Sequence, residues 1–278
     1  AVDETGALWT WGSGTNGKLG HGDGGEGSSW QGSNWPISAR VPKRVDALAE
    51  VRMRHVCAGS RHTLAVSSDG RLFTWGGGSK GKLGHGSVEE MLFPEEVVLI
   101  PSQRVRRKFY DTRVRQVAAG TNHSVVLTEG GDVYTMGWGE EGQLGNGVYS
   151  QAGGEGPVWQ SIPEPVRSLT VPLTAAAVNK MWRGEVIHEI LERTGGLSFR
   201  HGATKEELNR QLLAGQPDNA PSVEVAAGDH HTLVRTADGK VFSFGRGFAG
   251  QLGHNDTRQV SIPKRIDGGA LRAQLSKQ

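Results

Sequence analysis

The sequence predicts an all-β fold, a β-propeller with about four blades and a small helical insertion. Three observations support this prediction. The 42 glycines and 11 prolines are interspersed with Trp, Val and Leu and do not form a low-complexity tract, which indicates many tight turns between short strands. One strand-like segment recurs four times, and each copy follows a pair of turn residues. The four copies of this segment are residues 8–12, 72–76, 133–137 and 241–245.

Each copy is predicted to form a hairpin and further strands around this segment. Asp-Gly between alternating apolar runs is a strong hairpin signal, because glycine adopts a positive φ without steric cost. A strand before the turn is visible in three copies, and a Leu-Gly pair and a proline follow the aromatic strand. About four short strands per unit are the makeup of a propeller blade. The turn pairs are Thr5-Gly6, Asp69-Gly70, Gly130-Gly131 and Asp238-Gly239, the preceding strands include residues 58–63, 119–124 and 227–232, and the prolines are Pro42, Pro94, Pro163 and Pro263.

The spacing of the copies sets the expected boundaries. The glycines that end the aromatic strands are separated by 64, 61 and 108 residues, so the last interval holds one repeat plus an insertion of about 47 residues. The expected units are a partial first repeat at 1–50, a second at 51–112, a third at 113–172, a helical insertion at 173–219 and a fourth repeat at 220–278.

The repeat resembles that of the regulator of chromosome condensation family. The second copy carries the resemblance most fully, in Ala58-Gly59 before His62-Thr63, the Asp69-Gly70 turn, Thr74-Trp75-Gly76 and Gly81-Lys82-Leu83-Gly84. The resemblance implies a seven-bladed propeller, of which this chain holds about four blades. Because the first copy starts in the middle of a blade, we expect a fragment of a longer polypeptide.

Glycine-rich loops could be mistaken for a dinucleotide-binding motif. A G-x-G-x-x-G pattern occurs in all four copies, beginning at Gly12, Gly76, Gly137 and Gly245. A dinucleotide site requires such a loop to open a helix whose N-terminus faces the pyrophosphate. Here each loop runs into a Leu-Gly pair that cannot propagate a helix. We therefore expect turns and no cofactor.

The histidines and the cysteine recur at fixed repeat positions. None of the ten histidines shows the short spacing of a zinc site, so no metal is expected, and each repeated imidazole is expected to hydrogen-bond the turn backbone of its own blade. Cys57 takes the place of Ala118 and Ala226, which indicates a small packing residue. No nucleophile–base constellation is present, so the sequence predicts no enzyme. The repeated histidines are His62, His123 and His231, and His21, His85 and His254.

The net charge and the cysteine content limit the kinds of partner and the cellular compartment that we expect. With 31 basic and 29 acidic residues, the net charge of +2 does not by itself imply nucleic acid or a membrane surface. A single cysteine fits a reducing compartment, which predicts a cytoplasmic or nuclear location. No apolar run approaches the roughly 20 residues that span a bilayer, so no membrane partner is expected.

Function is expected where the repeat is interrupted. The first interruption is a basic segment that continues to Arg113 and Arg115 and contains Phe109 and Tyr110. It suits contact with an acidic protein surface or with phosphates, or a nuclear import signal; the alternative is a solvated connector between blades. The candidate residues of this segment are Arg104, Arg106, Arg107 and Lys108.

The second interruption is the predicted insertion. Its apolar side chains follow a helical period, and a second helix is indicated by Thr204 three residues before Glu207, a capping-box spacing. These helices could dock a partner, or they could pack against the blades or each other. The candidate residues are Met181, Trp182, Ile187, Ile190 and Leu191.

Two functions remain open at this point. The resemblance and the lack of a catalytic constellation favour a protein-interaction or scaffold module with a regulatory role within a longer chain. The resemblance also implies an alternative, guanine-nucleotide exchange on a Ran-like small GTPase, either with or without association with chromatin. Exchange needs no covalent chemistry, because the factor only stabilises the nucleotide-free GTPase.

Overall fold

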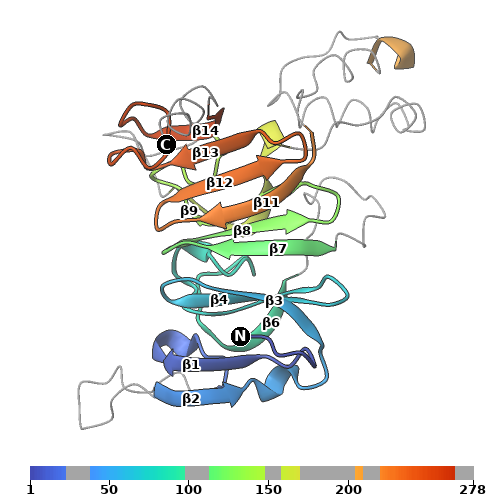
Figure 1. The fold of residues 1–278 in the computed structure, drawn as a ribbon, viewed down its shortest axis with the longest axis vertical. Helices are drawn as coiled ribbons and strands as arrows, with labels where there is room; N and C mark the ends of the chain where they lie inside the picture. The colour runs from blue at the N-terminus through green and yellow to red at the C-terminus, as the bar shows by residue number, and fades with distance from the viewer. Residues whose placement is uncertain (23–37, 98–112, 148–157, 170–203, 209–219, 267–278) are drawn as a thin grey trace, which may run out of the picture.

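The computed structural model describes residues 1–22, 38–97, 113–147, 158–169, 204–208 and 220–266. It consists of a row of antiparallel sheets stacked in chain order from the N-terminal to the C-terminal blade (Figure 1). Three sheets have four strands each and the first has two, which confirms the predicted all-β propeller architecture. The first two blades contain β1 (Trp9–Ser13), β2 (Ser38–Arg44), β3 (Met53–Ala58), β4 (His62–Ser67), β5 (Leu72–Gly76) and β6 (Met91–Val97).

The third and fourth blades repeat the meander of the second. In each of these sheets the strands neighbour one another in sequence order, and all pairs are antiparallel. The strands are β7 (Val114–Ala119), β8 (His123–Thr128), β9 (Val133–Trp138) and β10 (Trp159–Pro165), followed by β11 (Ser222–Ala227), β12 (His231–Thr236), β13 (Val241–Gly245) and β14 (Val260–Arg265).

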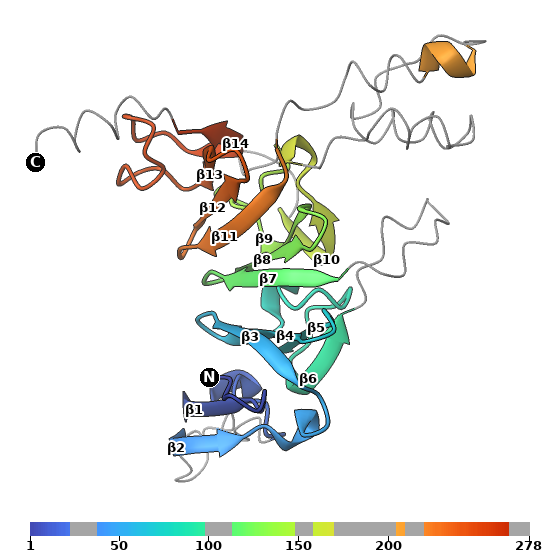
Figure 2. The ribbon, with the colours of Figure 1, turned by 45° about the vertical axis from the view of Figure 1, so that its right-hand side comes forward.

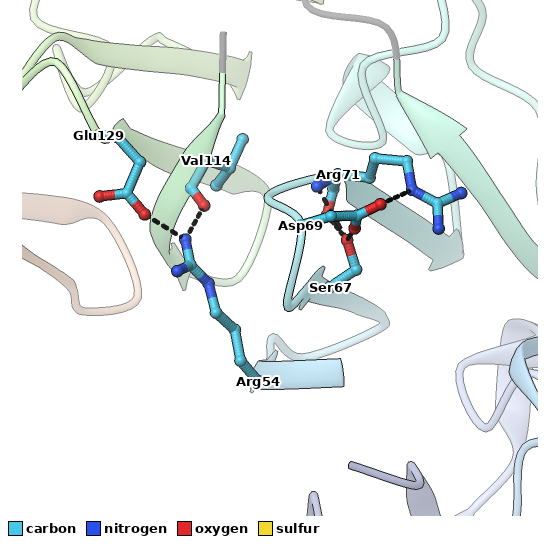
Figure 3. Close-up of polar contacts among 6 residues, drawn as sticks. All are labelled: Arg54, Ser67, Asp69, Arg71, Val114 and Glu129. Atoms are coloured by element: carbon cyan, nitrogen blue, oxygen red, sulfur yellow. Dashed lines mark hydrogen bonds and ion pairs between the residues drawn. The ribbon is translucent and has the colours of Figure 1, made fainter. Parts of the chain in front are cut away.

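The predicted turn pair joins the second and third strands of a blade. Gly70, between β4 and β5, has a φ of 88°, and its N–H donates to the Ser67 carbonyl at 3.0 Å. The Asp69 carboxylate accepts from the Ser67 hydroxyl and, at 2.9 Å, from Arg71 Nε (Figure 3). The left-handed backbone and this capping carboxylate explain why an Asp-Gly pair suits the turn.

The first strand of a blade lies against the first two strands of the preceding blade, β7 against β3 and β4 and β11 against β7 and β8. Figure 2 shows β7 between β3 and β11, with β6 and β10 farther out. The last strand of each blade is therefore an outer edge, and each carries a proline. Proline lacks an N–H, so it fits an edge strand and protects that edge against pairing with another chain. These prolines are Pro42 in β2, Pro94 in β6, Pro163 in β10 and Pro263 in β14.

The core lies between the blades. Alternate side chains of a central strand point to opposite faces of its sheet, so β4 packs against both neighbouring blades. Ala65 joins Phe73 and Trp75 in a cluster shared with the first blade, whereas Leu64 and Val66 join a cluster shared with the third. Each blade is thus stabilised mainly by its neighbours, as expected for a repeat architecture.

The glycine-rich loops form turns, as predicted. Two of them contain single 3-10 turns, η1 (Thr15–Gly17) and η3 (Ser79–Gly81), in which Asn16 and Lys80 have left-handed backbone angles. No α-helix begins at these two loops, so they lack the geometry of a dinucleotide site. The blade connections contain two further 3-10 turns, η2 (Asp46–Leu48) and η4 (Arg167–Leu169).

Part of the predicted insertion is described. Residues 205–208 are helical, and the capping box is confirmed: Thr204 N–H donates to Glu207 Oε2 at 2.8 Å, and Glu207 N–H donates to Thr204 Oγ1 at 3.3 Å. Leu208 is buried. Within the described ranges, no helix is long and apolar enough to cross a membrane.

Candidate partner-binding face

The repeated histidines in the central strands link neighbouring blades. His62 in β4 is fully buried, and its Nε2 lies 2.9 Å from the Ser124 hydroxyl of the next blade. Ser124 Oγ donates its own proton to the Lys82 carbonyl at 2.7 Å, so it accepts from His62 Nε2–H. The prediction that this histidine bonds the turn backbone of its own blade is therefore wrong. Alignment of the repeats shows which residues are equivalent, but it does not show which residues of neighbouring blades are in contact.

The same link recurs between the third and fourth blades. His123 Nε2 lies 3.1 Å from Thr232 Oγ1, which donates to the Gln143 carbonyl at 2.9 Å. Burial is the largest cause that lowers the pKa of both His62 and His123 to about 3, and the Lys82 charge adds to it at His62. Both imidazoles are thus neutral and carry their proton on Nε2.

Each histidine of the second set contacts its own blade, as predicted, but the contact is with a Thr or Ser hydroxyl and not with the turn backbone. His85 Nε2 lies 2.8 Å from Thr74 Oγ1, which donates to the Leu83 carbonyl at 2.7 Å. His21 and His254 make the equivalent contacts in the first and fourth blades. Across the residues that the structure describes, no three His, Cys, Asp or Glu side chains are grouped to hold a metal ion.

The large side chains of the third strands fill the blade junctions. Trp75, Met136 and Phe244 are buried against the Leu-Gly turn of the preceding blade. A Cβ at Gly20 would lie 2.8 Å from Trp75 Nε1, and one at Gly145 would lie 2.8 Å from Phe244 Cε2, so only glycine leaves room for these rings. Trp11 has the same repeat position and is 50% exposed. The repeated glycine, histidine and aromatic residues are therefore accounted for as structure.

Lys82 is a fully buried cation at one junction. Its Nζ donates to the carbonyl and hydroxyl of Ser79, at 3.0 and 2.7 Å, and lies 3.4 Å from Asn122 Oδ1. No carboxylate in the described part of the chain forms a salt bridge with it. Burial lowers the pKa of Lys82 to about 8, with Arg61 contributing. All three donor directions have an acceptor, so this amine is a packing group.

One end of the blades, the connector face, holds the turns at Gly6, Gly70, Gly131 and Gly239 together with the connections between blades. Backbone bonds fasten each connection to the preceding turn: Val114 N–H donates to the Gly70 carbonyl at 2.8 Å, and Ser222 N–H donates to the Gly131 carbonyl at 3.2 Å. The chain leaves the second blade after Val97, whose partner Leu72 follows the Gly70 turn.

Both interruptions of the repeat begin and end on the connector face. Residues 98–112 join β6 to β7, and residues 170–219 join η4 to the start of the fourth blade. The remaining loops of the blades lie at the opposite end. The candidate residues that the sequence singled out lie outside the described residues, and these are Arg104, Arg106, Arg107, Lys108, Met181, Trp182, Ile187, Ile190 and Leu191.

An arginine strap crosses the connector face between the second and third blades. The guanidinium of Arg54, in β3, donates to the Val114 carbonyl and to Glu129 Oε1 at 2.6 Å (Figure 3). Arg52, Arg113 and Arg115 are exposed beside it. Sequence reasoning missed Arg52 and Arg54. Their signal was an Arg-x-Arg pair at the same repeat position as Arg113 and Arg115.

These features define a class of protein: a β-propeller of four-stranded blades whose repeated polar residues form hydrogen bonds within a blade and between neighbouring blades. A family model described as "Regulator of chromosome condensation (RCC1) repeat" matches residues 5–66, 69–127, 130–178 and 238–272. A second model for the same repeat matches residues 53–82, 114–143 and 223–251. The chain belongs to the RCC1 repeat family.

Curated relatives carry several different names. The chain is 29% identical to the ultraviolet-B receptor UVR8 of Arabidopsis thaliana, over 96% of this chain and 55% of the relative. It is 32% identical to human RCC1 domain-containing protein 1, over 83% and 54%. It is also 32% identical to the human probable E3 ubiquitin-protein ligase HERC6, over 82% of this chain but only 22% of that protein. The chain thus spans about half or less of these relatives.

Solved structures confirm the fold. Human WBSCR16 superimposes with a TM-score of 0.61 at 22% identity, covering 95% of this chain and 53% of that one. Yeast RCC1 (Prp20), solved bound to Kap60, gives a TM-score of 0.60 at 19% identity, covering 97% and 46%. At these identities the likeness concerns the architecture alone.

Proposed function

We propose that this chain is a non-enzymatic protein-interaction module that holds a protein partner on its connector face. One observation carries the proposal: both interruptions of the repeat, 98–112 and 170–219, begin and end on that face. Departures from a rigid repeat are where binding residues usually lie. The repeated histidines, by contrast, make structural hydrogen bonds, either to the next blade, as in the His62–Ser124 contact, or within their own blade, as in the His85–Thr74 contact.

The proposed binding residues are those that the sequence singled out, in a basic and an apolar group. The basic group suits an acidic surface, and the apolar group suits an amphipathic helix or a groove. They are Arg104, Arg106, Arg107 and Lys108, and Met181, Trp182, Ile187, Ile190 and Leu191. We propose a cytoplasmic or nuclear location, which imaging of a fluorescent fusion of the full-length protein would test.

Affinity purification tests the binding function. The full-length protein is compared with one variant that lacks residues 173–219 and with another in which Arg104, Arg106, Arg107 and Lys108 are changed to Gln. We expect a set of co-purified proteins that shrinks with either change. Identical sets from all three would remove both segments from the binding site, and an empty set from the unaltered protein would contradict the function itself.

A second candidate is guanine-nucleotide exchange on a Ran-like small GTPase. It is favoured by the structural likeness to Prp20p from Saccharomyces cerevisiae, which was described with its binding properties to Gsp1p and histones. Release of a fluorescent nucleotide from a Ran-like GTPase, with and without the full-length protein, tests this function. Unchanged release at micromolar protein would exclude exchange on that GTPase, and binding to histones would be tested separately.

A further inference from the structure

The connector face contains two arginines at the same repeat position in different surroundings. Arg54 follows the buried Met53 in β3, and Arg115 follows the buried Val114 in β7. Each is exposed, and each belongs to the first strand of its blade. Because the two positions are equivalent, the groups that bind Arg54 indicate which kind of group would bind Arg115.

Arg54 is neutralised within the molecule. Its guanidinium reaches the next blade, where it binds the Val114 carbonyl and Glu129 Oε1 at 2.6 Å (Figure 3). Glu129 lies at the tip of the β8–β9 turn, held by its N–H, which donates to the Arg113 carbonyl at 2.8 Å. A carboxylate supplied by the turn of the next blade thus completes this site.

Arg115 lacks that carboxylate. The equivalent tip of the next turn is Ala237, whose N–H donates to the Pro221 carbonyl at 2.9 Å just as Glu129 N–H donates to Arg113. Among the described residues, the side chain of Arg115 makes no hydrogen bond or ion pair. The nearby acids of the fourth blade are already paired, Glu224 with Arg235 at 2.9 Å and Asp238 with Lys240 at 2.8 Å.

We propose that Arg115 binds a carboxylate from an acidic segment of a protein partner, at the place where Glu129 binds Arg54. Arg113, which immediately precedes β7, is also exposed and contributes positive charge near this end of the strand. A guanidinium binds a carboxylate with two parallel donors, which gives orientation as well as attraction. This inference rests on the proposed binding function and names the chemistry of its partner.

A protein segment fits this site better than a nucleic acid does. Duplex DNA carries about one charge per 1.7 Å and is bound by extended positive surfaces. On the connector face the arginines are interrupted by acids at the turn tips, Glu4, Asp69 and Asp238 besides Glu129. Three of these acids are paired with basic side chains, which leaves Arg115 as a local positive site and not as part of an extended positive surface. Such a site suits a short segment with one or a few carboxylates better than a long polyanion.

Fluorescence anisotropy with a short labelled peptide of alternating Asp and Ser tests the inference. We expect Arg115→Gln to raise the dissociation constant roughly ten-fold, because one charge-assisted pair is lost. Ala237→Glu should weaken binding by a similar factor, because it supplies Arg115 with an internal partner. Glu129→Ala should strengthen binding about three-fold by freeing Arg54.

The controls separate this effect from general electrostatics and from misfolding. Arg258→Gln removes an exposed arginine from the opposite end of the blades, and it should leave the affinity unchanged. An Asn-Ser peptide should not bind, and every variant should keep the thermal unfolding temperature of the unaltered protein. The inference is overturned if Arg115→Gln binds the acidic peptide normally, or if duplex DNA competes more strongly than the peptide.

The affinity purification described above separates this inference from the function on which it rests. If the unaltered protein and its Arg115→Gln variant retain the same partners, the module binds proteins but not through this arginine. If neither retains a partner, the binding function itself fails.

Discussion

The junction between the second and third blades and the junction between the third and fourth use the same parts with one difference. In both, a buried histidine donates to a hydroxyl of the next blade, His62 to Ser124 and His123 to Thr232. In both, that hydroxyl donates to a backbone carbonyl of the preceding blade. The residue supplying the carbonyl is the charged Lys82 in one case and the neutral Gln143 in the other.

The difference shows which groups are the same in both junctions and at which position the residue type can vary. The backbone carbonyl acts in both junctions, so the side chain at that position can vary in charge without changing the histidine contact. The charge of Lys82 nevertheless lowers the stability of the fold, because a buried cation without a carboxylate partner is poorly solvated. Substitutions at matched positions in the two junctions therefore test which groups stabilise the blades.

The largest expected effect comes from the apolar side chains that fill the junctions. Phe244→Ala should lower the free energy of unfolding by about 4 kcal/mol and Met136→Ala by about 3 kcal/mol, through lost burial and the cavity left behind. Trp11→Ala, at the same repeat position but half exposed, should cost less than about 1 kcal/mol. Urea unfolding measures all three, and equal losses would contradict the role assigned to burial.

Acid should weaken both histidine links. The pKa of His62 and of His123 is about 3 in the folded chain and about 6.5 in the unfolded chain, so the unfolded chain binds more protons between these values. Stability is therefore lost as the pH falls below 6.5, by about 2 kcal/mol per histidine at pH 5. Urea titrations from pH 7.5 to 5 check this.

A matched variant identifies the groups responsible. His62→Gln keeps an N–H donor but cannot take up a proton, so it should remove about 2 kcal/mol of the stability lost by pH 5. His123→Gln should remove a similar share. An unaltered pH profile in both variants would show that other groups govern the acid response.

Loss of a linking hydroxyl should have a smaller effect. Ser124→Ala leaves His62 Nε2–H buried without an acceptor, which should cost about 2 kcal/mol. Ser124→Thr, which copies the residue of the other junction, should cost less than about 1 kcal/mol. Unfolding free energies at pH 7.5 distinguish the two, and equal losses would show that packing matters more than the hydroxyl.

Exchange of the charged residue should have the smallest effect and the opposite sign. Lys82→Gln should stabilise the fold by about 1 kcal/mol at pH 7, and Gln143→Lys should destabilise it. The pKa of Lys82 is about 8, below its unfolded value of about 10.5, so the stability of the unaltered protein should rise with pH between these values. That rise should be absent in Lys82→Gln, and its persistence would assign it to another group.

Much of the fold could be predicted from the sequence because its signals are local. The Asp69-Gly70 turn, the alternating β5 segment and the Thr204–Glu207 capping box each depend on residues close together in the chain, and each is found in the structure. The glycine loops were likewise separated from a dinucleotide motif by the residues that follow them.

The contacts between blades could not be predicted, because they join residues that are far apart in the sequence. Lys18 and Lys82 occur in the same Gly-Lys-Leu-Gly sequence, yet only Lys82 is fully buried, because Asn122 of the third blade lies over it. Trp11 and Trp75 share a repeat position, but Trp75 is buried because it packs against Gly20 of the preceding blade, whereas Trp11 is 50% exposed. The Arg54 strap also depends on a residue 75 positions away, Glu129, which no spacing rule indicates.

The close approach of the linking histidines to glycine gives each junction its own magnetic signature. A Cβ at Gly59 would lie 2.6 Å from His62 Nδ1, and the ring of His123 lies equally near Gly120. Aromatic ring currents shift the resonances of protons held over a ring, so the α-protons of these two glycines should be displaced in the NMR spectrum. Each glycine belongs to the same blade as its histidine, so separation of two blades would change the shift only by freeing the ring from the hydroxyl of the next blade that holds it. The two glycines would then report separately on the His62 and His123 links.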